Sequence, residues 1–214
     1  MKRTLVKICG ITRGEDALAA EQADCDAIGL VFWPGSKRCV DIARARLIRS
    51  QLSAAVVVVG VFVEPDVEMV RRHISELNLD AVQLCGQLAE GAWDELSTSV
   101  RLIRAIGVGN REIDPAERLA FVSDYMLDNG GQGSYGGTGQ PFDWRLGNGV
   151  REWGHLWLAG GLTSANVGEA IRRLSPYAVD VSTGVESRPG VKSPELIGAF
   201  VQAVREADAM GPGQ

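Results

Sequence analysis

Short β-branched segments alternate with longer segments of helical period along the chain, and this alternation limits the possible folds more than any other feature. Segments such as Val56-Val57-Val58-Val59 are apolar on both faces, as parallel strands covered by helices must be. The alternation therefore predicts eight right-handed strand–helix units. Strands are expected at 5–9, 27–32, 56–63, 81–84, 102–106, 125–128, 156–159 and 178–181, and helices at 14–23, 42–52, 67–76, 92–97, 115–122, 144–152, 165–174 and 194–207.

Eight such units can close into a barrel or lie open as a doubly wound sheet. The 214 residues are few for eight units plus a further domain, and no Pro/Gly/Ser-rich linker divides them. The glycine-rich loops suited to phosphate follow the sixth, seventh and eighth strands, whereas a dinucleotide-binding fold has its glycine loop after the first. We therefore predict an α/β fold, a single (β/α)8 TIM barrel with eight parallel strands over residues 1–209, and a short flexible tail at 210–214.

Charge and composition exclude several classes of protein. A net charge of −5 argues against a nucleic-acid partner, and the longest apolar run, residues 54–63, is about half the length of a membrane span. None of the four cysteines forms a C-x-x-C pair, and only two histidines are present, so no metal site is expected. The N-terminus lacks the apolar stretch of a signal peptide. We expect a cytoplasmic enzyme with reduced thiols, acting on a small molecule, either as a monomer or as a homodimer.

Two titratable residues end predicted strands, at the face where (β/α)8 barrels carry their active sites. Cys9 ends the first strand and Asp128 the sixth. From its position alone, Cys9 is as easily a small buried hydrophobic residue as a functional thiol. Asp128 could be a helix cap or turn residue, but caps stand immediately before a helix, and a glycine-rich stretch at 130–139 intervenes here. The pattern favours a functional role for Asp128.

Five segments together resemble the motifs of the phosphoribosylanthranilate isomerases, in order and over nearly the whole chain. They are K-I-C-G-I-T at 7–12, G-G-T-G at 136–139, F-D-W at 142–144, A-G-G-L at 159–162 and D-V-S-T-G-V-E at 180–186. The resemblance implies an Amadori rearrangement in tryptophan biosynthesis, without cofactor or metal. In this reaction N-(5-phosphoribosyl)anthranilate becomes 1-(2-carboxyphenylamino)-1-deoxyribulose 5-phosphate.

The reaction needs an acid that protonates the furanose oxygen and a base that removes the proton from C2 of the sugar. The resemblance favours Cys9 as the base and Asp128 as the acid. Strands one and six lie across the barrel mouth from each other, so the two side chains could flank the sugar. An acid at pH 7 needs a raised pKa, which a poorly solvated barrel mouth can supply.

The resemblance also implies how the substrate is held. Arg38, in the loop after the second strand, is expected to bind the anthranilate carboxylate with its planar fork. Asp180, at the end of the eighth strand, is a weaker candidate, for orienting the region of the phosphate-binding loops. The remaining candidates are glycines and hydroxyls: Gly160, Gly161, Ser182, Thr183 and Gly184 for the phosphate, and Gly137 and Gly139 in a loop that folds over the substrate.

One position departs from the family pattern. Cys85 stands after Gln-Leu, where a His is common in the family, and we read it, like Cys25 and Cys39, as a residue without a catalytic role. Two alternative functions remain open. A histidine-pathway or dual-substrate isomerase barrel would carry a carboxylate at position 9 and two phosphate sites. A non-catalytic phosphate- or flavin-binding barrel would fit the glycine loops but would leave Cys9 and Asp128 without a role.

Overall fold

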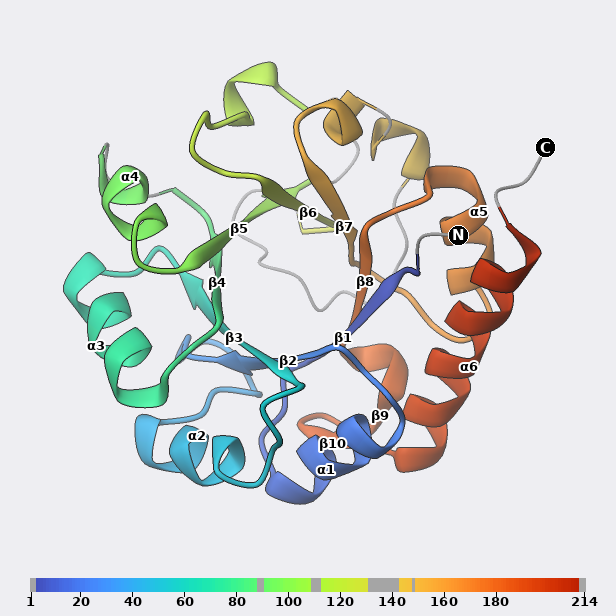
Figure 1. Ribbon diagram of the computed structural model, residues 1–214, viewed down its shortest axis with the longest axis horizontal. Helices are drawn as coiled ribbons and strands as arrows, with labels where there is room; N and C mark the ends of the chain where they lie inside the picture. The colour runs from blue at the N-terminus through green and yellow to red at the C-terminus, as the bar shows by residue number, and fades with distance from the viewer. Residues whose placement is uncertain (1–2, 88–90, 109–112, 131–142, 148, 212–214) are drawn as a thin grey trace.

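The computed structural model describes residues 3–87, 91–108, 113–130, 143–147 and 149–211. Eight strands form a closed barrel in the order of the chain, and every neighbouring pair is parallel (Figure 1). The predicted (β/α)8 barrel is therefore confirmed. The strands are β1 (Leu5–Cys9), β2 (Ala27–Val31), β3 (Val57–Val63), β4 (Ala81–Cys85), β5 (Arg101–Gly107), β6 (Asp124–Asp128), β7 (His155–Leu158) and β8 (Ala178–Val181).

In the described ranges, six α-helices cover the outside of the barrel, each near a predicted position. Capping side chains fix several of their starts: Asp41, Asp66 and Ser193 each accept a hydrogen bond from the backbone N–H three residues on. The last helix reaches Met210, and residues 212–214 of the predicted tail lie outside the described residues. The helices are α1 (Gly14–Gln22), α2 (Ile42–Arg49), α3 (Val67–Leu77), α4 (Ala92–Ser97), α5 (Val167–Leu174) and α6 (Pro194–Met210).

The helix predicted at 115–122 is wrong. A single 3-10 turn, η1 (Pro115–Glu117), stands in its place. The buried Tyr125 explains the difference, because its hydroxyl accepts a hydrogen bond from the backbone N–H of Leu119 at 3.0 Å and donates one to the Leu119 carbonyl at 2.8 Å. A tertiary contact thus satisfies the backbone groups that a helix would have paired.

The helix predicted at 144–152 is also wrong. Two 3-10 turns, η2 (Trp144–Gly147) and η3 (Gly149–Glu152), cover this part of the barrel. Two glycines fall inside the segment, and each costs a helix interior about 1 kcal/mol relative to alanine. A Cβ at position 147 would lie 3.2 Å from Leu127 Cδ1, so the backbone here packs closely on the outer wall of the barrel.

A short antiparallel hairpin follows β8 and was not predicted. It consists of β9 (Glu186–Arg188) and β10 (Val191–Lys192), and Gly190 in its turn has a φ of +79°. Positive φ strains any residue other than glycine. The hairpin returns the buried side chain of Lys192 towards the loop that follows β8, where its Nζ lies 3.1 Å from the Ser182 carbonyl oxygen.

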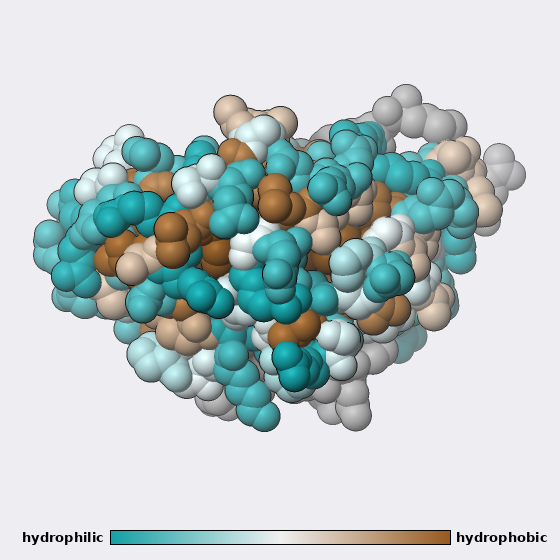
Figure 2. All heavy atoms as spheres, turned by 90° about the horizontal axis from the view of Figure 1, so that it is seen from below, coloured by the Kyte–Doolittle hydropathy of each residue, from teal (hydrophilic) through white to brown (hydrophobic). Residues whose placement is uncertain are grey.

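Apolar side chains form an inner and an outer core. The inner core, within the barrel, includes Ala81, Met126 and Trp157, and the larger outer core lies between strands and helices. Polar residues cover much of the face shown in Figure 2, with apolar residues between them. Among the described large apolar residues, Leu47, Leu196 and Met210 are exposed. No helix in the described ranges has the length and apolarity needed to cross a bilayer.

Candidate active site

Cys9 lies at the carboxyl end of β1, with its side chain buried beside Val31 and Val61. It stands opposite Gly29 of β2, where a Cβ would lie only 2.7 Å from the Cys9 Sγ. The thiol therefore fits because its neighbour has no side chain. Burial raises the pKa of Cys9, and the charge of Lys7 acts in the opposite direction.

Asp128 lies at the carboxyl end of β6, as predicted. Its Oδ1 is buried and has no hydrogen-bond partner among the described residues. Burial, followed by the negative charge of Asp180, raises the pKa of Asp128 to about 6. A carboxyl in this state holds its proton closer to neutral pH than an exposed aspartate does. The raised pKa that an acid would need is thus present.

The carboxyl of Asp128 also lies close to the loop after β7. Gly160 has a φ of +79°, and a Cβ there would lie 2.6 Å from the backbone nitrogen of Asn129 and 3.0 Å from the Asp128 Oδ1. Glycine at this position therefore allows the ends of β6 and β7 to approach each other. The approach places a predicted phosphate-binding residue beside the predicted acid.

A buried polar cluster lies in the barrel interior, two residues below Cys9 on β1. Lys7 Nζ donates to Asp180 Oδ1 of β8 at 2.8 Å and to Gln83 Oε1 of β4 at 2.9 Å. Gln83 Nε2 donates in turn to Cys85 Sγ at 3.7 Å. The sequence indicated Asp180 only weakly as a site residue, and it did not indicate Lys7 or Gln83 as site residues. The one available signal was a lysine inside the otherwise apolar strand 5–9, on the same face as Cys9.

Arg38 already holds a carboxylate of the chain itself. Its Nε and Nη2 donate to Glu186 Oε1 and Oε2, both at 2.7 Å. Lys192 Nζ lies 2.9 Å from Glu186 Oε1. Burial alone would raise the pKa of Glu186, but the hydrogen bond from Arg38 and the charge of Lys192 lower it. Sequence reasoning missed Glu186 and Lys192 as partners, since only the folded hairpin brings them to Arg38.

The predicted phosphate residues lie on two loops that pack against each other. Gly160 and Gly161 follow β7, whereas Ser182, Thr183 and Gly184 follow β8. A Cβ at position 184 would lie 2.1 Å from the Leu162 carbonyl oxygen, so the loops approach as closely as glycine permits. The structure thus brings these five residues to one side of the barrel mouth. Gly137 and Gly139 lie outside the described residues.

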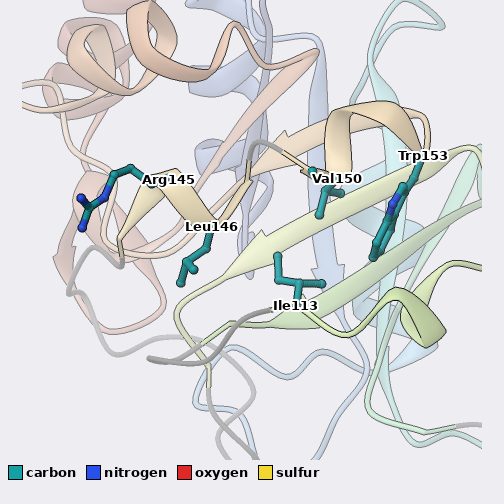
Figure 3. Close-up of a pocket in the computed structure, with 6 residues that line it drawn as sticks. Ile113, Arg145, Leu146, Val150 and Trp153 are labelled. Carbon is teal, nitrogen blue, oxygen red and sulfur yellow. The ribbon is translucent and has the colours of Figure 1, made fainter.

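A pocket of about 260 Å³ is present elsewhere, on the outer wall of the barrel (Figure 3). Ile113, Leu146, Val150 and Trp153 line it where η2 and η3 replace a full helix. None of the candidate site residues contributes to this pocket. The site therefore has to be sought at the carboxyl ends of the strands. The described residues contain no group of three His, Cys, Asp or Glu side chains that could hold a metal ion.

The barrel has eight parallel strands, and a thiol and a carboxyl lie at the carboxyl ends of two of them. These features define the class of (β/α)8 barrels that carry titratable groups at the substrate-binding face. A model of the family described as N-(5'phosphoribosyl)anthranilate (PRA) isomerase matches residues 6–203. The chain belongs to this family.

Individual relatives agree with the family match. N-(5'-phosphoribosyl)anthranilate isomerase of Rubrobacter xylanophilus is 42% identical over 209 residues, which cover 94% of this chain and 98% of the relative. A solved structure of phosphoribosyl anthranilate isomerase from Thermotoga maritima has a TM-score of 0.85 at 37% identity and covers 95% of this chain and 99% of its own. Another, in complex with reduced 1-(o-carboxyphenylamino)-1-deoxyribulose 5-phosphate, has a TM-score of 0.82 at 35% identity and covers the same shares.

Proposed function

We propose that this protein catalyses the Amadori rearrangement of N-(5-phosphoribosyl)anthranilate to 1-(2-carboxyphenylamino)-1-deoxyribulose 5-phosphate, a step of tryptophan biosynthesis. The observation that carries the proposal is the state of Asp128. Its carboxyl lies at the barrel mouth, its Oδ1 has no hydrogen-bond partner among the described residues, and its pKa is raised to about 6. An exposed aspartate is almost fully ionised at neutral pH, whereas a pKa of about 6 keeps a small fraction of the Asp128 carboxyl protonated and able to donate a proton.

Asp128 acts first in the proposed mechanism. Its proton goes to the furanose ring oxygen, the bond between that oxygen and C1 breaks, and the nitrogen lone pair forms an iminium with C1. Cys9, as thiolate, then removes the proton from C2. The electron pair of the C2–H bond forms a C1–C2 double bond, and the C1–N π electrons return to nitrogen. The resulting enol becomes the ketone when C1 gains a proton and the C2 hydroxyl loses one.

Three groups of residues hold the substrate in this scheme. Arg38 binds the anthranilate carboxylate, and the two hydrogen bonds to Glu186 leave other N–H groups of its five for this purpose. Asp180 of β8 orients the region of the phosphate-binding loops. The phosphate is bound by Gly160, Gly161, Ser182, Thr183 and Gly184.

The proposed function also concerns the binding partner, the location and the oligomeric state of the protein. The partner is a small phosphorylated molecule, and we assign no role in binding nucleic acid or membranes. We place the reaction in the cytoplasm. One of the similar solved structures is of monomers generated from a dimeric enzyme of Thermotoga maritima. For this chain both a monomer and a homodimer are compatible with the proposal.

The experiment is to follow consumption of phosphoribosylanthranilate by the loss of its fluorescence, with wild type and Cys9→Ala. We expect Cys9→Ala to lower kcat by at least about 10²-fold, because general base catalysis contributes about 10²–10⁴-fold. Cys39→Ala is the matched control, since Cys39 is an exposed thiol, and its turnover is expected to equal that of wild type. Turnover of Cys9→Ala near the wild-type rate would remove Cys9 as the base.

A further inference from the structure

Lys7 is a fully buried cation in the centre of the barrel. It stands two residues before Cys9 on β1 and therefore on the same face of the strand. Its ammonium reaches Asp180 on β8 and Gln83 on β4, so it spans the interior directly below the mouth. Burying an ion costs several kcal/mol, and an ion pair of this kind can often be replaced by apolar residues without loss of stability. Stability alone therefore does not explain the lysine.

The ammonium of Lys7 also lies beside Cys9. A Cβ at Gly29 would lie 2.7 Å from Cys9 Sγ and 3.2 Å from Lys7 Cε, so both side chains occupy the space that this glycine leaves free. An ammonium has three N–H donors. Among the described residues two of them are used by Asp180 and Gln83, which leaves one donor available to a negative charge on Cys9.

The Lys7–Asp180 pair is oriented with respect to the two candidate catalytic groups. At Cys9 the charge of Lys7 has a larger effect than that of Asp180, and it lowers the pKa. At Asp128 the order is reversed, and the charge of Asp180 raises the pKa more than that of Lys7 lowers it. The positive end of the pair thus acts on the thiol and the negative end on the carboxyl.

We propose that Lys7 is a positioning residue, whose buried ammonium holds the negative charge of Cys9 when this thiol acts as the base. The inference rests on the proposed function, because it needs Cys9 to remove a proton. Lys7 itself does not exchange a proton with the substrate. Gln83 and Asp180 keep the ammonium below Cys9 by accepting two of its hydrogen bonds.

Several other charged or titratable groups act on Cys9 and have to be kept constant in a test. They come from different elements: Asp180 from β8, Lys192 from β10, Arg38 from the loop after β2 and Cys85 from β4. A variant that changes Lys7 alone would leave Asp180 as an unpaired buried anion. The informative comparison is therefore Asp180→Asn with the double variant Lys7→Met/Asp180→Asn, since position 180 is neutral in both.

The test is a pH titration of Cys9 by ¹³C NMR in the full chain labelled with [3-¹³C]cysteine, with the Cys9 signal assigned from Cys9→Ala. An opposite charge within about 4–6 Å shifts a pKa by about 1–3 units. We expect the Cys9 midpoint to lie at least about one pH unit higher in Lys7→Met/Asp180→Asn than in Asp180→Asn. At neutral pH kcat should be at least about tenfold lower, and the deficit should shrink as the pH rises to the new midpoint.

Lys37→Met is the matched control, because it removes an exposed lysine from the loop after β2 and is expected to leave the Cys9 midpoint unchanged. If Lys7→Met/Asp180→Asn does not fold, Lys7→Gln/Asp180→Asn takes its place with the same expected shift. Equal midpoints with and without the lysine would overturn the inference while leaving Cys9 as the base. Wild-type turnover in Cys9→Ala would overturn both, and the turnover assay identifies that failure.

Discussion

Strand β6 begins and ends with an aspartate, and the two have opposite environments. Asp124, at the start, is fully buried and accepts hydrogen bonds from Arg101 at 2.5 and 3.0 Å, from Trp157 Nε1 at 2.9 Å and from Ser123 Oγ at 3.0 Å. Burial would raise its pKa, but these partners lower it. Asp128, at the other end, has an Oδ1 without a partner in the part of the chain that the structure describes, and its pKa is raised to about 6.

The difference shows that one strand can carry a stabilising carboxylate at its amino end and a candidate catalytic carboxyl at its carboxyl end. At the amino end, the donors around Asp124 are matched to a carboxylate, which stabilises the fold. At the carboxyl end, no described residue donates to one oxygen of Asp128, which costs stability but leaves a group able to react. The same residue type thus acquires different roles from its partners, as expected for the two faces of a (β/α)8 barrel.

The largest expected effect is on catalysis at the carboxyl end. Asp128→Asn keeps the shape of the side chain but cannot deliver a proton, so kcat should fall by at least about 10²-fold. Binding of a product analogue should be nearly unchanged, and steady-state kinetics together with calorimetry measure both quantities. An Asn variant with wild-type kcat would break the comparison, because Asp128 would then be no more than a cap or turn residue.

The next effect is on folding at the amino end. Asp124→Asn removes the charge that pairs with Arg101 and places an amide among donors, so we expect a loss of about 3 kcal/mol in the free energy of unfolding. Urea denaturation measures this loss. Turnover per folded molecule should stay close to that of wild type. A stable Asp124→Asn protein with impaired kcat would show that the amino end also takes part in the chemistry.

A pH series sharpens the comparison further. The pKa of Asp128 is about 6 in the folded protein and about 3.9 in an unfolded chain, so the folded state binds more protons between these values. The contribution of Asp128 to the free energy of unfolding therefore falls as the pH rises from about 4 to about 6. Asparagine does not ionise. We therefore compare the free energy of unfolding of Asp128→Asn with that of wild type. The difference, Asp128→Asn minus wild type, should be about 1–2 kcal/mol more positive at pH 8 than at pH 4.

Urea denaturation of wild type and Asp128→Asn at several pH values measures this difference. The contribution of Asp124 to the free energy of unfolding has the opposite pH dependence, because folding lowers the pKa of this residue. The contribution is fully present above the pKa of the unfolded chain, and it is lost as the pH falls through the pKa of the folded protein. A stability difference between wild type and Asp128→Asn that stays constant from pH 4 to pH 8 would contradict a raised pKa at Asp128.

The smallest effect concerns a single partner of Asp124. Ser123→Ala removes one hydrogen bond to a carboxylate that keeps its bonds to Arg101 and Trp157. We expect a loss of about 0.5–1 kcal/mol in the free energy of unfolding and no change in kcat. Thermal and urea denaturation measure the loss. A loss as large as that of Asp124→Asn would mean that the bonds to Asp124 act as one cooperative unit.

The sequence was sufficient for the barrel and for the positions of Cys9 and Asp128, because strand ends can be read from local patterns and the motifs mark them. It was insufficient where a contact between two elements decides local structure. The segment 115–122 has the composition of a helix, yet Tyr125 of β6 binds the backbone of Leu119 instead. The two residues are only six positions apart, but the periodicity of the segment does not reveal their contact.

Side-chain partners were the least predictable part of the site. Arg38 was predicted to bind the substrate carboxylate, whereas the carboxylate that it contacts in the structure is Glu186, which is 148 positions away. Lys7 stands in the chain as a lone polar residue in an apolar strand, and its meaning depends on Asp180 and Gln83 from two other strands. Such pairs arise only when the barrel closes.

Closure of the barrel has a consequence for the order in which the protein can form. Strand β1 pairs with β8 through residues such as Leu5 and Ala178, and Thr4 bonds to Asp208 of α6 at 2.6 and 2.8 Å. During synthesis the first strand leaves the ribosome long before its last partner exists. The edge of β1 that pairs with β8 therefore stays unpaired until β8 has been synthesised. The Lys7–Asp180 pair can form only after that.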